Sequence, residues 1–286
     1  MHTSIITTIT SKTRTVTISR DLPTVIIGER INPTGRTRVL QALQIGDFEQ
    51  IRQDALAQVQ AGAQLLDINA GVPDMDEVQL LPRLIKEVVS VVDVPLCIDT
   101  ANPKALAAAL QVYEGKALIN SVNGEESSLS SVLPLASEHH AAVIALCMDD
   151  NGIPATSEQR LKVAANIIDR ALQFGIPFED IIIDPLVMAI SANSQAGRIT
   201  FETINKVIQE FGLNIAIGAS NISFGLPDRE RLNAAFLAMA IQAGVTCPIT
   251  NPLSMSIRKT VLGADLALGR DDFAAHWIND FRARNV

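Results

Sequence analysis

The chain has 286 residues, of which 48% are hydrophobic and 19% charged, with a net charge of −8. That charge argues against a broad cationic surface for nucleic acid or anionic lipid, so a small ligand or a protein partner is expected. The apolar runs fall short of the about 18 residues of a membrane span, and the N-terminus lacks the basic and apolar regions of a signal peptide. We therefore expect a cytoplasmic protein with one large core.

Short aliphatic runs alternate eight times with helix-length segments. The runs lie at 25–28, 65–69, 95–98, 117–119, 142–148, 181–183, 215–217 and 245–249. Continuous apolar runs are typical of strands that are buried on both faces. The intervening segments predict helices near 47–61, 76–92, 129–139, 157–174, 200–211 and 229–243, with another that begins at Pro103. The alternation predicts an α/β protein, a parallel (β/α)8 TIM barrel rather than an open doubly wound sheet.

The N-terminal residues 1–22 lie outside the predicted barrel, which takes residues 23–286. Alternating residues at Ile5–Thr10 and Thr15–Ser19 fit a two-stranded hairpin that plugs the bottom of the barrel. A disordered leader fits these residues equally well. Neither alternative changes the opposite face of the barrel, where ligands are expected.

Cysteine and histidine positions argue against a bound metal. The three cysteines, each inside an apolar run, are expected to be reduced core residues: Cys97, Cys147 and Cys247. The four histidines do not cluster with them and are expected to be structural or solvated: His2, His139, His140 and His276. Zinc sites need clustered His and Cys ligands, so no metal site is predicted.

Four strand ends carry side chains that form hydrogen bonds: Asp99, Asn120, Asp184 and Asn221. In a closed parallel barrel such ends gather at the face that binds small molecules. Carboxylates at the ends of apolar strands gain most from a ligand with paired N–H donors, such as the pyrimidinone edge of a pterin, and asparagine can donate and accept. Singly, each residue has a structural alternative, which is helix capping for Asp99 and loop or turn roles for the others.

Six motifs occur in order along the chain. They are Gly-Glu-Arg-Ile-Asn-Pro-Thr-Gly-Arg (28–36), Leu-Asp-Ile-Asn-Ala-Gly (66–71), Cys-Ile-Asp-Thr (97–100), Ile-Asn-Ser (119–121), Ile-Asp-Pro (183–185) and Ser-Asn-Ile-Ser-Phe-Gly-Leu-Pro (220–227). From about residue 24 onward the chain resembles the pterin-binding methyltransferases. These comprise the methyltetrahydrofolate:corrinoid-protein methyltransferases and the folate domain of cobalamin-dependent methionine synthase. The resemblance implies a dihydropteroate-synthase-like TIM barrel.

The resemblance also implies roles for individual residues. Asp99, Asn120 and Asp184 would hold the pterin ring, and Asn221 would lie beside N5, the nitrogen that bears the methyl group. Three more residues would line the pocket or lie near the ligand: Gly218, Ser220 and Arg229. The pocket floor and the residues behind it would be Glu29, Asn32, Asp67 and Asn69. For Glu29, a buried ion pair with Arg30 or Arg36 is an open alternative.

The implied reaction moves a methyl group between N5 of tetrahydrofolate and the cobalt of a corrinoid. N5 must gain a proton or a strong hydrogen bond as the carbon–nitrogen bond of 5-methyltetrahydrofolate breaks, and cob(I)alamin is a strong enough nucleophile to accept the methyl group. We expect Asn221 to be catalytic by donating to N5, an effect of roughly 2.7 to 4 kcal/mol for comparable donors. The direction of transfer is left open.

The corrinoid (cobalamin) must come from a separate protein, because the chain has no Asp-x-His-x-x-Gly cobalt-ligand motif. The resemblance further implies a homodimer. Two alternatives remain. Dihydropteroate synthase would show a Gly-Gly-Glu-Ser-Thr-Arg-Pro-Gly loop and a Ser-x-Lys motif, where this chain has Asn69–Pro73 and Ser220-Asn221 without a lysine. A non-catalytic pterin-binding or carrier-docking protein would bind tetrahydrofolate without turnover.

Overall fold

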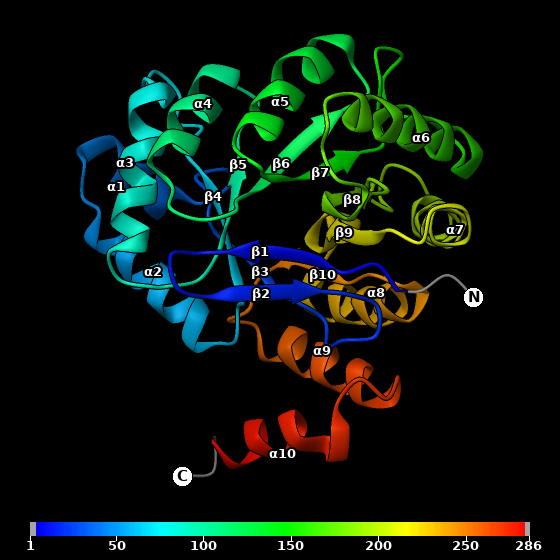
Figure 1. Ribbon diagram of the computed structural model, residues 1–286. Coiled ribbons are helices and arrows are strands. Elements are labelled where there is room, and N and C mark those ends of the chain that lie inside the picture. The colour runs from blue at the N-terminus through cyan, green and yellow to red at the C-terminus, as the bar shows by residue number, and fades with distance from the viewer. Residues whose placement is uncertain (1–3, 284–286) are drawn as a thin grey trace.

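The computed structural model describes residues 4–283, and within them eight parallel strands close into a barrel (Figure 1). The strands are β3 (Ile27–Ile31), β4 (Leu65–Asn69), β5 (Leu96–Asp99), β6 (Leu118–Asn123), β7 (Ala142–Leu146), β8 (Ile181–Asp184), β9 (Asn214–Gly218) and β10 (Cys247–Thr250). Each strand pairs with its neighbour in sequence, and β10 pairs with both β9 and β3. This is the predicted (β/α)8 TIM barrel.

Helices follow the strands and cover the outside of the barrel. They are α2 (Glu49–Gln60), α3 (Glu77–Val89), α4 (Pro103–Val112), α5 (Glu126–Glu138), α6 (Ser157–Gln173), α7 (Ala196–Glu210), α8 (Arg229–Ala243) and α9 (Met255–Ala267). Shorter elements are α1 (Thr37–Ile45), α10 (Ala275–Arg282) and the 3₁₀ turns η1 (Phe178–Asp180), η2 (Ala219–Ser223) and η3 (Asp272–Ala274). Helix α4 begins at Pro103 as predicted, and Asn102 caps it, because the Asn102 side chain accepts from the backbone N–H groups of Lys104 and Ala105.

Some helix boundaries differ from the prediction. Helix α2 begins at Glu49, two residues after the predicted start at Asp47, whose carboxylate accepts from the N–H of Glu49 in a local turn. Helix α5 begins three residues earlier than predicted, after a turn in which Asn123 accepts from the N–H of Glu125. Helix α1 was not predicted. These boundaries depend on side-chain turns that the apolar periodicity does not report.

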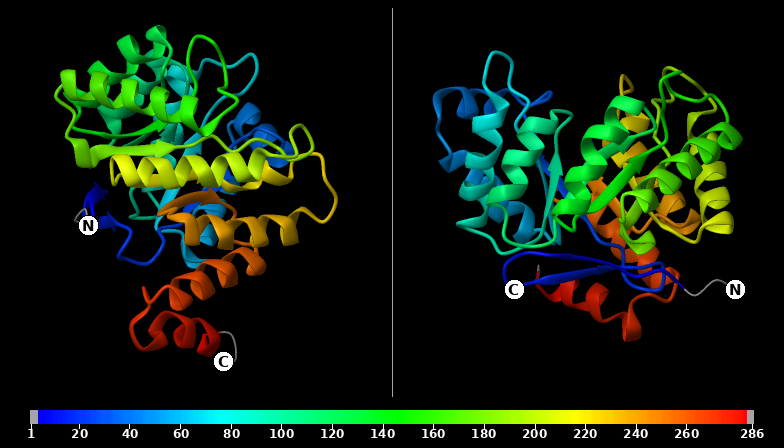
Figure 2. Two further views of the ribbon diagram at one scale, coloured as in Figure 1. Left: turned by 90° about the vertical axis from the view of Figure 1, so that its right-hand side faces the viewer. Right: turned by 45° about the horizontal axis from the view of Figure 1, so that its top comes forward.

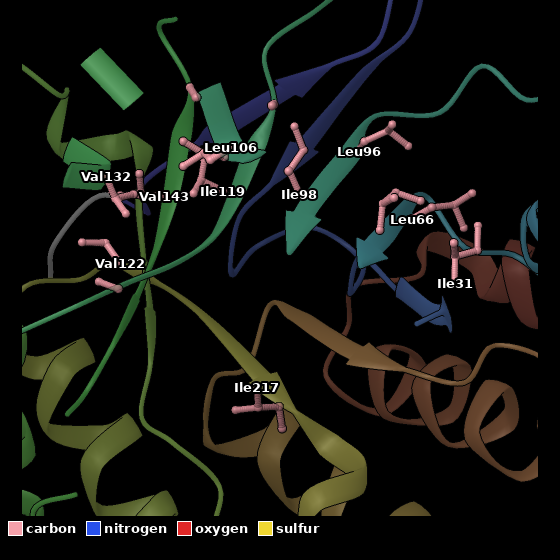
Figure 3. Close-up of a cluster of buried hydrophobic side chains, with 14 of the residues drawn as sticks. Ile31, Leu66, Leu96, Ile98, Leu106, Ile119, Val122, Val132, Val143 and Ile217 are labelled. Carbon is pink, nitrogen blue, oxygen red and sulfur yellow. The ribbon is translucent and has the colours of Figure 1, made fainter. Parts of the chain in front are cut away.

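Alternation along the strands separates two cores. Side chains that point outward pack between the strands and the helices, and Figure 3 shows part of this layer, including Ile98, Ile119 and Val143. Side chains that point inward fill the barrel, and the buried interior cluster includes Leu65 and Cys97. The three cysteines are free and buried, as predicted.

An antiparallel hairpin of β1 (Thr7–Thr10) and β2 (Thr15–Ile18) lies across one end of the barrel (Figures 1 and 2). Its residues Ile9 and Ile18 are buried with the barrel interior. The Tyr113 hydroxyl joins the hairpin to the barrel, because it accepts from the N–H of Leu96 at 3.0 Å and donates to the carbonyl of Thr10 at 2.9 Å. Leu96 begins β5, so the hairpin closes the end where the strands start and leaves the opposite end open.

The described residues 4–283 include no helix that combines the length and the apolar character required to cross a membrane. His2 lies outside this range.

Candidate active site

Strand register brings polar side chains to one level at the open end of the barrel. Asn69 of β4 is paired with Asp99 of β5, and Asp99 is paired with Asn120 of β6. Asp184 ends β8 opposite Leu146 of β7. Inward-facing positions alternate along a strand, so Asp67 lies one layer below Asn69. The sheet itself therefore places three of the predicted residues side by side: Asn69, Asp99 and Asn120.

These side chains form a network that we term the acid–amide cluster: Asn32, Asp67, Asn69, Asp99 and Asn120. One carboxylate oxygen of Asp99, Oδ2, accepts from Asn69 Nδ2 at 3.0 Å and from Asn32 Nδ2 at 3.4 Å. Asn120 Nδ2 donates to Asp67 Oδ1 at 3.0 Å. The amides thus orient both carboxyl groups.

Burial changes the proton affinity of this cluster. The pKa of Asp99 is raised to about 6, mainly by burial, with the hydrogen bond from Asn69 acting against the rise. The pKa of Asp67 is raised well above its usual range, first by burial and then by the charge of Asp99. Two neighbouring carboxyl groups in a low-dielectric site disfavour a second negative charge. A ligand that donates hydrogen bonds here therefore favours the ionised form of Asp99.

A cavity of about 420 Å³ lies beside the acid–amide cluster. Its lining includes Asp99, Asn120, Ser121 and Leu146. Volumes of this order are typical of small-molecule sites, in which polar groups fix the orientation of the ligand.

Asp184 is 9% exposed and stands at the start of a tightly held loop. Its Oδ1 accepts from the N–H of Leu186 at 2.7 Å, and Leu186 has a φ of +65°, which is unfavourable for a branched side chain. Burial raises the pKa of Asp184 to about 7, against the opposing effects of the Leu186 N–H and the Arg160 charge. This carboxyl group is therefore divided between its two protonation states near neutral pH.

Arg160 holds the Asp184 loop in place and was missed by the sequence reasoning. It lies on α6, is 3% exposed, and its Nη1 donates to the carbonyl oxygens of Pro185 and Leu186, both at 2.7 Å. Its Nε donates to the carbonyl of Pro154 at 3.1 Å. An arginine inside an amphipathic helix gives no local signal of such a role, because its partners are distant backbone groups.

The remaining predicted residues gather on the other side of the opening in what we term the glutamate–arginine cluster: Glu29, Arg36, Ser220 and Arg229. Arg36 Nη2 lies 3.4 Å from Glu29 Oε1, one of the two pairings expected from the sequence. Ser220 Oγ lies 3.4 Å from each carboxylate oxygen of Glu29. Arg229 Nη2 donates to the carbonyl of Ser220 at 2.9 Å, so Arg229 fixes the η2 turn.

Asn221 lies in the η2 turn and is exposed at the opening. A Cβ atom added to Gly218 would lie 2.9 Å from Asn221 Nδ2. Glycine at this position therefore leaves space for the Asn221 carboxamide.

A second cavity, of about 270 Å³, adjoins this cluster and is lined by Glu29, Ser220, Arg229, Asn233 and Thr250, among others. The predicted residues thus form two groups at one barrel opening, with Asp99 and Asn120 at the larger cavity and Glu29, Ser220 and Arg229 at the smaller. Over residues 4–283, no three His, Cys, Asp or Glu side chains are arranged to hold a metal ion.

Known proteins match this architecture. The sequence model of the family described as "Pterin binding enzyme" matches residues 28–251. The fold is that of a pterin-binding TIM barrel, and the chain belongs to the pterin binding enzyme family.

Particular relatives narrow the comparison. The chain is 31% identical to the methylcorrinoid:tetrahydrofolate methyltransferase of Eubacterium limosum, over 92% of this chain and 97% of that protein. It is 29% identical to methionine synthase of Mycobacterium tuberculosis, over 82% of this chain but 21% of that protein. Dihydropteroate synthases of Vibrio fischeri (TM-score 0.69, 19% identity, 92% and 99% coverage) and Yersinia pestis (TM-score 0.68, 17% identity, 89% and 96% coverage) share the fold.

Proposed function

We propose that the protein transfers a methyl group between N5 of tetrahydrofolate and the cobalt of a corrinoid carried by a separate protein. The observation that carries this proposal is the single barrel opening that has buried carboxyl groups on one side and an exposed asparagine, Asn221, on the other. Membership of the pterin binding enzyme family supports a pterin as the ligand. The names of the E. limosum relative and of the methionine synthase relative support methyl transfer as the reaction. The E. limosum relative is named for transfer from a methylcorrinoid to tetrahydrofolate, so we propose this direction as the physiological one.

The pterin binds in this proposal through the carboxyl groups of Asp99 and Asp184. The pterin edge presents an amide-like N–H beside an exocyclic amine, which suits carboxylates already stripped of much of their water. The carboxamide nitrogen of Asn120 donates a hydrogen bond to Asp67, which leaves the carboxamide oxygen of Asn120 available to accept a hydrogen bond from the ligand. Because Asn69 and Asn32 fix Asp99, little side-chain entropy is lost on binding.

Asn221 acts on N5 in this proposal. The basicity of N5 changes when its methyl group arrives or departs, and a donor aimed at N5 lowers the barrier if its hydrogen bond is strongest in the transition state. Gly218 gives the carboxamide its space and Arg229 fixes the turn that carries it.

The corrinoid on its carrier protein supplies the cobalt that gives up or accepts the methyl group. The carrier would dock over the open end of the barrel, because the hairpin closes the other end. We also propose that the protein is a homodimer and acts in the cytoplasm.

One assay tests the function. The protein is mixed with methylcobalamin and tetrahydrofolate, and separately with reduced cobalamin and 5-methyltetrahydrofolate, while the corrinoid spectrum is followed. Turnover in either mixture is expected. Binding of tetrahydrofolate without any turnover would point to a non-catalytic binding protein. Synthesis of pteroate from para-aminobenzoate would point to a dihydropteroate synthase.

A further inference from the structure

We propose that Glu29 and Ser220 form a path for the proton that N5 exchanges during methyl transfer, and that the 270 Å³ cavity connects this path to solvent. The inference rests on the proposed function and adds the route by which N5 gains or loses its hydrogen. It assigns Glu29 a role in proton movement in addition to its ion pair with Arg36.

The geometry of the path begins at the η2 turn. Ser220 is adjacent to Asn221 in sequence, and its hydroxyl faces both oxygens of the Glu29 carboxylate at 3.4 Å. A hydroxyl can accept a proton on one side while it donates its own on the other. Ser220 is thus suited to pass a proton between the ligand side of the turn and Glu29.

The cavity behind Glu29 and Ser220 is polar and large enough for water. Both residues line it, and the Glu29 side chain is 23% exposed. Asn233 also lines the cavity; it is 9% exposed, and its Oδ1 has no hydrogen-bond partner within residues 4–283. A buried carbonyl of this kind requires a donor. Water in the cavity supplies that donor and extends the proton path to the surface.

The charges around Glu29 allow it to take up and release a proton. Burial is the largest influence and raises the pKa of Glu29, while the positive charges of Arg36, Arg30 and Arg229 and the Ser220 hydroxyl lower it. Two acidic residues also lie near Glu29. The charge of Glu29 raises the pKa of Asp67 on β4, and Glu230 of α8 lines the same cavity as Glu29. Burial outweighs the positive charges, so the pKa of Glu29 is raised above its ordinary value.

The balance of the step is simple. Before transfer to the folate, N5 carries one hydrogen; its lone pair forms the new bond to the methyl carbon, and the pair of the broken carbon–cobalt bond stays with the metal. N5 then bears a positive charge and loses its proton to the Ser220 oxygen, directly or through one water, as the Ser220 hydroxyl proton moves to Glu29. Glu29 passes a proton to the cavity water. The reverse sequence protonates N5 of 5-methyltetrahydrofolate.

A purely structural role for Glu29, as the partner of Arg36, makes different predictions. Arg36 reaches one oxygen of Glu29 at 3.4 Å, the same distance as the Ser220 hydroxyl, so the two roles are separated by experiment rather than by distance. If this pair were the only role, the neutral isostere Glu29→Gln would alter folding or pterin affinity and leave the pH dependence of the rate unchanged.

The test measures single-turnover methyl transfer across pH 5–9, with pterin affinity measured by calorimetry in Glu29→Gln, Glu29→Asp and Ser220→Ala. We expect Glu29→Gln to slow transfer about 10²- to 10⁴-fold, as for loss of a general acid–base group, and to flatten the pH profile. Affinity for tetrahydrofolate should remain close to that of the parent, and Glu29→Asp should recover part of the rate. Ser220→Ala should shift the rate in the same direction by less, because water can replace a hydroxyl.

Glu114→Gln is the matched control, since this exposed glutamate pairs with Lys12 on the surface. A parent-like rate and pH profile in Glu29→Gln, or equal losses of rate and affinity in it, would overturn the inference. If Glu29→Gln does not fold, an unchanged rate and pH profile in Ser220→Ala would overturn it, and a slowed, flattened profile would support it. Absence of transfer by the parent protein would instead remove the proposed function and the inference together.

Discussion

The two sides of the barrel opening are built by different means. The acid–amide cluster comes mainly from consecutive strands, and the register between β4, β5 and β6 aligns its members. The glutamate–arginine cluster joins the middle of β3 to the loop after this strand, to the η2 turn and to the first residue of α8. Side chains on strands are fixed by the sheet, whereas those on loops depend on a few long contacts.

This difference suggests a division of labour. A rigid array of carboxyl and amide groups suits the binding of a flat heterocycle, because its geometry is set before the ligand arrives. The turn that carries Asn221 is held by Arg229 rather than by strand pairing, and it presents the donor proposed to act on N5 at the open end of the barrel. Substitutions on the two sides should therefore separate affinity from turnover.

The largest expected effect is on turnover in Asn221→Ala. Loss of a donor that strengthens in the transition state should lower kcat about 10²- to 10³-fold, with the affinity for tetrahydrofolate changed by a few-fold at most. Steady-state kinetics and calorimetry on the same preparation measure both quantities. Gly218→Ala should reproduce part of the kcat loss, because the added Cβ displaces the Asn221 carboxamide.

Asn166→Ala, on the exposed surface of α6, is the control for the asparagine substitution. Equal losses of kcat and affinity in Asn221→Ala would assign Asn221 to binding and erase the contrast between the two sides.

A smaller effect, on affinity, is expected in Asp184→Asn. Hydrogen bonds to charged groups contribute about 1.5 to 3 kcal/mol, so affinity at pH 8 should fall about 10- to 150-fold while kcat for bound substrate changes less. The pKa of Asp184 is about 7 and that of Asp99 about 6, and the pterin donors favour the ionised forms. Below these values protons compete with the ligand, so affinity should rise with pH from 5 to 7 and then level off.

Calorimetry in buffers of different ionisation enthalpy checks this dependence by detecting proton release on binding below pH 7. Asp184→Asn should reduce that release, whereas Asp169→Asn on the exposed surface of α6 should leave it intact. An affinity that does not change with pH in the parent protein would show that these carboxyl groups do not hold the ligand.

The positions of the site residues on the strands could be predicted from the sequence. The run Leu65–Asn69 is the observed strand β4, and its alternation places Asp67 and Asn69 inside the barrel. Asp99 and Asn120 follow by the same rule at the ends of aliphatic runs. This success has a physical basis, because a strand buried on both faces admits a polar residue only where the barrel opens.

The contacts of the site residues on loops could be predicted only in part. The sequence indicated that Glu29 pairs with Arg30 or Arg36, and the structure shows Arg36. The sequence did not indicate that Arg229 donates a hydrogen bond to the η2 turn. It also did not indicate that Arg160, on helix α6, donates hydrogen bonds to the loop after Asp184. Such contacts depend on loop conformations, including the positive φ of Leu186, that periodicity does not encode.

The smallest effect is expected in Arg160→Ala and concerns the free energy of unfolding. This variant tests whether the position of Asp184 depends on an arginine that holds its loop, as the position of Asn221 depends on Arg229. Removing this guanidinium leaves the carbonyl oxygens of Pro185 and Leu186 without their donor, which should cost about 1 to 3 kcal/mol of unfolding free energy in urea titrations. Pterin affinity should fall with it, because the loop that positions Asp184 loosens. Arg198→Ala is the control, since Arg198 is exposed and its ion pair with Glu202 contributes about 0 to 1 kcal/mol.

The outcome separates two ways of building the binding side. If Arg160→Ala loses stability and affinity together, while Asp184→Asn loses affinity alone, the carboxyl group binds and the arginine only positions it. If Arg160→Ala keeps full affinity despite the lost stability, the strand β8 alone fixes Asp184. The residues proposed to bind the pterin would then be positioned by strands alone. Asn221, in contrast, would be positioned by a turn that depends on Arg229.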